Sequence, residues 1–171
     1  MIDTSIKVVS DSGPLLSFAR AGRLDILRQV LGEIIIPEAV FEEITIRGKG
    51  KPGATEIGTS RWIRRRTLKN RALLNRLSKS LNVGETEALA LAQEMNVILL
   101  VDESEARREA QRLGVQHFGS LRVLKEAKDR GIITKVKPVL DDLMASGTYI
   151  GDSLYNEFLR AVGEGDKPAT K

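Results

Sequence analysis

The chain has 171 residues, of which 42% are hydrophobic and 29% are charged; this suits one globular domain with a sizeable core. It contains no cysteine and one histidine, His117, which excludes disulfides, thiol nucleophiles, zinc–thiolate sites and mechanisms that need two histidines. It has no long apolar stretch and no charged-then-apolar leader, so we expect no membrane span, no signal peptide and a cytoplasmic location.

The net charge of +4 is unevenly distributed. Segment 47–79 carries eleven basic side chains and one acid, Glu56, and therefore a net charge of +10, whereas the rest of the chain has −6. This segment suits a polyanionic partner such as nucleic acid, although a solvated surface of unpaired charge explains it equally well. Only one aromatic residue, Trp62, lies among these cations, which favours phosphate contact over base stacking.

Strands and helices are predicted in alternation along the chain. The first half predicts, in order, strand 6–10, helices 13–20 and 24–31, strand 34–36, helix 38–46, a Gly- and Pro-rich loop at 48–53, and edge strand 62–68. The second half predicts helix 70–81, helix 85–95, strand 97–101, helix 103–113, strand 115–118, and helices from about 120, 136 and 152. Such alternation favours a parallel sheet covered on both faces.

Two of the predicted strands end on an aspartate. Asp11 follows the first apolar run, and Asp102 follows the run at 97–101. Because the carboxyl ends of parallel strands form the ligand crevice of an open sheet, these carboxylates are candidates to share one metal ion.

Helical geometry sorts the glutamates between and beside these aspartates. Glu85 lies on the apolar line of its helix, whereas Glu87 falls about 200° away on the polar side. Glu43 borders the buried stripe of its helix and Glu42 points away. Glu103 lies on the apolar line of the following helix. Three glutamates are therefore expected to point inward, where an unpaired carboxylate costs several kcal/mol.

Each of these acids also has a structural explanation. Glu85 and Glu103 stand in first helical turns, where the helix dipole favours an acid, and Asn82 or Asp102 serves as an N-cap. Glu43 is explained equally well as an ion-pair partner of an arginine. Taken together, four negative charges that converge on one place favour the presence of a divalent cation that compensates their repulsion.

Four segments in this order and spacing resemble the PIN-domain nucleases. They are Asp11–Leu16, Pro37–Glu43, Gly84–Ala92 and Leu99–Glu103. Further matches through Gly119–Leu121 and Ala127–Ile133 resemble a subgroup with an uncharacterised C-terminal helical extension. The resemblance implies a three-layer α/β/α sandwich with a central parallel sheet, in which 1–134 form the PIN-like domain, 135–163 its helical extension and 164–171 a disordered tail.

The resemblance also implies a metal-dependent ribonuclease site that leaves a 5′-phosphate. Its metal-binding and catalytic acids would be Asp11, Glu43, Glu85 and Asp102, with Glu103 replacing or supplementing Asp102, and Mg²⁺ or Mn²⁺ as the ion. Ser12 matches a small hydroxyl residue that orients Asp11 or a bound water; an N-cap role explains it at least as well.

The expected partner is RNA, held through its backbone by Arg64, Arg66, Lys69 and Arg71. Many similar proteins are toxins of toxin–antitoxin pairs (VapC-like), so the resemblance implies a homodimer and an antitoxin protein as further partners. One alternative is a non-catalytic nucleic-acid-binding or protein-interaction module. Another, phosphoryl transfer with Asp11 as the nucleophile, ranks last because the chain lacks an Asp-x-Asp arrangement.

Overall fold

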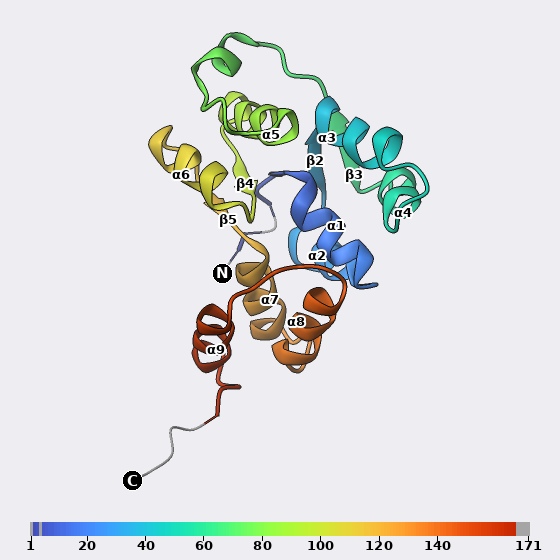
Figure 1. Ribbon diagram of the computed structural model, residues 1–171, viewed down its shortest axis with the longest axis vertical. Helices are drawn as coiled ribbons and strands as arrows, with labels where there is room; N and C mark the ends of the chain where they lie inside the picture. Colours follow the sequence, from blue (N-terminus) through green and yellow to red (C-terminus); the bar gives the residue numbers. More distant parts are fainter. Residues whose placement is uncertain (1, 4, 167–171) are drawn as a thin grey trace.

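A computed structural model describes residues 2–3 and 5–166 of the chain. Five parallel strands form one sheet in the order β3-β2-β1-β4-β5 (Figure 1). The strands are β1 (Val8–Ser10), β2 (Ile34–Pro37), β3 (Ile63–Arg66), β4 (Ile98–Leu100) and β5 (His117–Phe118). Strands β1 and β2, near the sheet centre, are fully buried and consist mostly of the β-branched residues Val and Ile, as is typical of a parallel sheet covered on both faces.

Helices cover both faces of this sheet and produce the predicted three-layer α/β/α fold. One layer contains α5 (Val83–Met95), which packs on β1, β2 and β4, and α6 (Ser104–Arg112) beside it. The opposite layer contains α1 (Ser12–Arg20), α2 (Leu24–Leu31) and α7 (Ser120–Asp129) (Figure 1). Phe18 and Leu27 of this second layer are fully buried.

The predicted helix over 38–46 is divided into two parts. An α-helix, α3 (Glu38–Glu42), continues into a π-helical turn, η1 (Glu43–Arg47). Such turns are rare in proteins, and those that occur are often found at functional sites. The loop expected at 48–53 is followed by a short helix that the sequence pattern did not predict, α4 (Ala54–Thr59).

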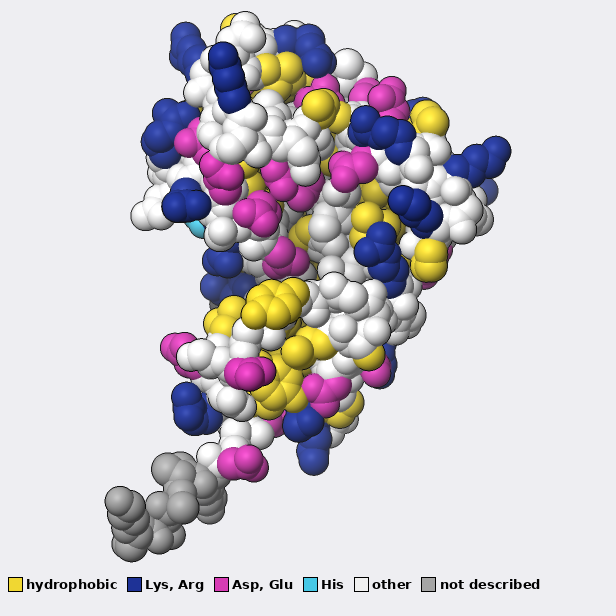
Figure 2. Space-filling model, in the orientation of Figure 1, with side chains coloured by type: hydrophobic (Ala, Val, Ile, Leu, Met, Phe, Trp, Pro, Cys, Tyr) yellow, Lys and Arg dark blue, Asp and Glu magenta, His cyan; other side chains and the backbone are white. Residues whose placement is uncertain are grey.

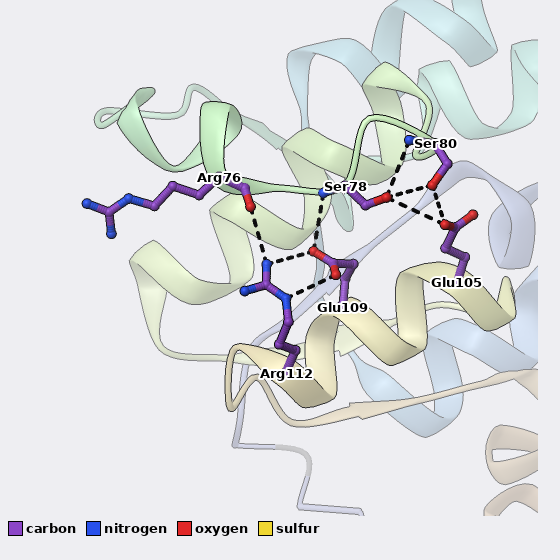
Figure 3. A network of polar contacts seen from close by, with 6 residues as sticks. All are labelled: Arg76, Ser78, Ser80, Glu105, Glu109 and Arg112. Atoms are coloured by element: carbon purple, nitrogen blue, oxygen red, sulfur yellow. Dashed lines mark hydrogen bonds and ion pairs between the residues drawn. The ribbon is translucent and has the colours of Figure 1, made fainter.

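The prediction of a basic helix over 70–81 was wrong, because only one 3₁₀ turn, η2 (Ala72–Arg76), forms there. Side chains from other helices satisfy the backbone of this segment instead. Glu94 accepts the N–H groups of Lys69 and Asn70, and Glu109 accepts that of Ser78 at 3.3 Å. Figure 3 shows the rest of this network, in which Arg76, Ser78 and Ser80 contact Glu105, Glu109 and Arg112 of α6.

The C-terminal part adds α8 (Val136–Ala145) and α9 (Asp152–Ala161); α8 packs on α7 and α1. Glu164, expected in a disordered tail, accepts the N–H groups of Val136 and Lys137 and pairs with Lys128 at 2.8 Å. It thereby caps the start of α8. Residues 167–171 of the predicted tail lie outside the described residues. Within the described ranges, no helix has both the length and the apolar character to cross a membrane.

Candidate functional site

The site lies at the carboxyl ends of the two central strands. Asp11 follows β1 directly, and Asp102 comes two residues after the end of β4. The pairing of Ser10 with Leu100, together with a 3.1 Å hydrogen bond from the Asp11 N–H to the Leu100 carbonyl, brings both segments to one edge of the sheet. This is where open α/β sheets bind ligands, and the sequence predicted it.

Asp11 is the most deeply buried acid of this group. Its side chain belongs to a residue only 5% exposed, and its Oδ1 is buried without a hydrogen-bond partner in the described part of the chain. Burial raises the pKa of Asp11 to about 7, and the nearby Glu85 and Glu43 carboxylates add to the rise, against the backbone N–H groups of Ser12 and Gly13. An unpaired buried oxygen in a negative field is typical of a cation site or a proton-holding site.

Glu43 reaches this place from the first position of the π-helical turn. It is half-buried, whereas its neighbour Glu42 is exposed, as the helical-face argument predicted. A Cβ atom added to Gly84 would lie 2.6 Å from Glu43 Oε2. Gly84 therefore lets the start of α5 approach the Glu43 carboxylate closely, and any larger residue there would displace it.

Glu85 takes part in a capping box at the start of α5. Its Oε2 accepts the Asn82 N–H at 3.0 Å, and its own N–H donates to Asn82 Oδ1 at 2.8 Å. Burial raises the pKa of Glu85, and Glu103, Glu43 and Glu105 add to the rise, while the bond from Asn82 opposes it. The capping role expected of Asn82 is thus real, and it coexists with a place for Glu85 among the acids.

Asp102 is held by the first residue of α7. Its Oδ1 accepts the Ser120 N–H at 2.7 Å and its Oδ2 accepts the Ser120 hydroxyl at 2.5 Å. A Cβ atom on Gly119 would lie 2.7 Å from Asp102 Oδ1, so this close approach requires glycine. Asp102 is exposed and does not cap α6, contrary to one sequence interpretation.

Three expectations about individual side chains were wrong. Glu103 is exposed and caps α6 by accepting the Glu105 N–H at 3.2 Å, because the helix begins only at Ser104 and helical spacing does not extend to position 103. Glu87 is buried and accepts the Ala39 N–H at 2.8 Å, because α3 covers the face of α5 expected to meet solvent. Ser12 is the first residue of α1 and not its N-cap.

The donor set suits a hard divalent cation, because it consists of carboxylate oxygens and includes the unpartnered Oδ1 of Asp11. Across residues 2–3 and 5–166, however, no three His, Cys, Asp or Glu side chains stand close enough together to hold a metal ion. Hydrogen bonds hold Glu85 on Asn82 and Asp102 on Ser120. Within those ranges, Asp11 Oδ1 has no hydrogen-bond partner, and no side-chain hydrogen bond or ion pair holds Glu43.

Three of the four cations selected from the sequence lie on β3 or contact the far end of α5, and Arg71 contacts the first half of that helix. Arg64 pairs with Glu33 at 2.8 Å, at the amino end of β2. Arg71 pairs with the buried Glu87 at 3.1 Å. Arg66 contacts Met95 at the end of α5 opposite Glu85, and Lys69 lies beside Glu94 on the same part of that helix. These partners direct most of the predicted RNA-binding surface away from Asp11.

A cavity of about 450 Å³ borders the acids and contains cations that sequence reasoning did not select. Glu43 and Gly84 line it together with the cations Arg20, Arg47 and Lys51. None of these three cations forms an ion pair with the described residues. Figure 2 shows acidic side chains gathered on this face with Lys and Arg side chains beside them. Arg47 and Lys51 belong to the basic segment, but Arg20 carried no sequence signal.

Comparison with known proteins agrees with this architecture. The family model DUF3368, described as a PIN domain, matches residues 7–164. Among solved structures, the fold is similar to that of a PilT N-terminus domain protein from the hyperthermophilic archaeon Sulfolobus solfataricus P2. The TM-score is 0.50 at 15% identity, covering 85% of this chain and 98% of that chain. No curated protein matches the chain.

Proposed function

Because this chain belongs to the PIN-domain family, whose members are generally nucleases, we propose that it is a metal-dependent endoribonuclease that hydrolyses RNA phosphodiester bonds. The observation that carries the proposal is the buried Asp11, whose Oδ1 lacks a partner in the described structure and whose pKa is raised by burial and by Glu85 and Glu43. Buried negative charge of this kind is destabilising unless a cation or a proton compensates it.

Asp11 and Glu43 are the residues that would hold a cation, with Glu85 and Asp102 beside them. Bound there, Mg²⁺ or Mn²⁺ supplies activation of a water and stabilisation of the charge that develops on the phosphate. Ser120 fixes the orientation of Asp102 and Asn82 that of Glu85. Exposed Glu103 stands at the rim and adds negative charge near Glu85.

The substrate backbone is assigned to the cations that share a cavity with Glu43. Arg20, Arg47 and Lys51 line the cavity that Glu43 also lines, and they have no ion-pair partner in the described ranges. Unpaired cations are free to contact phosphates, whereas Arg64 and Arg71 are already paired with carboxylates. We therefore place the main phosphate contacts in this cavity and secondary ones on β3.

The first test is the dependence of RNA cleavage on a divalent cation. We expect single-stranded RNA to be cleaved to 5′-phosphate products with Mn²⁺ and to stay intact with EDTA, and we expect Mn²⁺ to raise the melting temperature by binding the folded state. Gel analysis of labelled RNA and thermal melts measure both effects. RNA binding without turnover and without stabilisation by metal would instead favour a non-catalytic binding module.

The second test separates the cavity cations from those on β3. Arg47→Gln and Arg20→Gln should each weaken RNA binding severalfold and make the plot of log affinity against log salt less steep, by about 0.7 for each phosphate that the variant no longer neutralises. The same change at the ion-paired Arg64 should have less effect. Arg28→Gln, exposed on α2, controls for the removal of one charge. A larger effect at Arg64 than at Arg47 would favour the edge-strand surface.

A further inference from the structure

A second cavity, of about 710 Å³, opens beside the same acids. Gly13, Asp102 and Glu103 form its border with the site, and most of its remaining wall comes from α7 and the C-terminal part of the chain. The extension therefore contributes directly to the surroundings of the strand ends. In Figure 2, hydrophobic side chains gather below the acidic cluster, over the C-terminal helices.

Tyr149 lies on this cavity and is the most exposed large hydrophobic residue described, at 91%. It belongs to the segment between α8 and α9. The adjacent Thr148 fixes this segment, because its hydroxyl donates to Ser17 Oγ at 2.9 Å and its N–H donates to the Leu143 carbonyl at 3.0 Å. An aromatic ring is thus presented to solvent from an anchored backbone, which is typical of a stacking surface and not of a core.

The cavity also contains cations with no ion-pair partner in the parts of the chain described. Arg107 and Arg122 line it, and the Arg107 guanidinium lies near Gly119, beside Asp102. Leu121, Leu143 and Ile150 supply apolar wall. One aromatic face, apolar wall and free guanidinium groups suit a nucleotide, which has an apolar π-face and an anionic phosphate.

We propose that this cavity is a nucleobase-binding subsite for the RNA substrate. The inference rests on the proposed function: Tyr149 stacks on the base of a nucleotide adjoining the cleaved bond, and Arg107 contacts the phosphate of that nucleotide. A protein partner fits less well, because four charged side chains also line the cavity, and charged residues are depleted at the centre of protein interfaces. They are Asp102, Glu103, Arg107 and Arg122.

The test combines an abasic scan of a short single-stranded RNA with variants of the full chain, measured by fluorescence anisotropy in EDTA so that cleavage does not interfere. One abasic position should weaken binding to the wild type about tenfold. The same abasic RNA should bind Tyr149→Ala as tightly as the intact RNA does, because this variant already lacks the ring on which the base would stack. Tyr149→Phe should behave as wild type, and Ile6→Ala, which removes a 40% exposed side chain before β1, is the control.

An abasic penalty that is equal in the wild type and in Tyr149→Ala would overturn the subsite. A Tyr149→Ala protein that binds RNA normally but changes its oligomeric state would overturn it as well, in favour of a protein contact. Cleavage with Mn²⁺ is assayed in parallel. A protein that stacks RNA on Tyr149 without cleaving it would refute the proposed hydrolysis and retain the subsite, whereas absence of RNA binding would refute both.

Discussion

Asp11→Asn should lower the rate of RNA cleavage by more than about a hundredfold. Mutating a residue that only supports a metal ligand typically costs up to about a hundredfold, and loss of a ligand should cost more. The substitution preserves shape and removes the charge that would hold a cation at the end of β1. It should not unfold the protein, because the carboxylate it replaces is buried with an oxygen that lacks a partner in the described structure. Initial rates with Mn²⁺, together with thermal melts, measure both effects.

Glu43→Gln and Glu42→Gln form the matched pair for this experiment. They are neighbours at the junction of α3 and η1, and only Glu43 is half-buried and next to Gly84. We expect Glu43→Gln to reproduce most of the loss and Glu42→Gln to retain wild-type activity. Equal cleavage by the wild type and by Asp11→Asn would refute the assigned site.

The sequence predicts the position of these acids well where local periodicity decides it. Asp11 and Asp102 follow buried runs, and such runs become the central strands of the sheet. Glu43 is distinguished from Glu42 by its place on one helix, without knowledge of the rest of the fold. The PIN-like α/β/α architecture is confirmed because its alternating elements follow from the same local patterns.

The errors at Glu103 and Ser12 concern where a helix begins, and the other failures have a common physical cause, which is contact with residues distant in the chain. Glu87 is buried because α3 covers a second face of α5, and no pattern within α5 shows this. Arg64 and Arg71 bind acids at Glu33 and Glu87 instead of remaining free. The segment around η2 is held by glutamates from α5 and α6 instead of by its own helix. The toxin role, the antitoxin, the homodimer and the cytoplasmic location stay predictions.

The stability of the metal-free protein should depend on pH through Asp11. Burial raises the pKa of this carboxyl from 3.8 to about 7. Below pH 4 the Asp11 carboxyl is protonated in both the folded and the unfolded chain, so it does not lower the free energy of unfolding. Between pH 4 and pH 7 the unfolded chain loses this proton and the folded chain retains it, so the free energy of unfolding falls as the pH rises. Above pH 7 both states are ionised and the dependence ends.

The size of this effect follows from the shift in pKa. A difference of about three units corresponds to about 4 kcal/mol, so the free energy of unfolding of the wild type should fall by that order relative to Asp11→Asn between pH 4 and pH 8. Urea denaturation of both proteins in EDTA measures it; a difference that is the same at both ends of this range would place the pKa of Asp11 at its ordinary value.

Metal binding should reverse this loss. At pH 8 the ionised Asp11 is the form that binds a cation, so Mn²⁺ should raise the stability of the wild type more at pH 8 than at pH 5, where protons compete for the same oxygen. Asp11→Asn should show little stabilisation at either pH. The buried charge that destabilises the metal-free fold would then be the same charge that binds the ion, which links the pH dependence of stability to the proposed reaction.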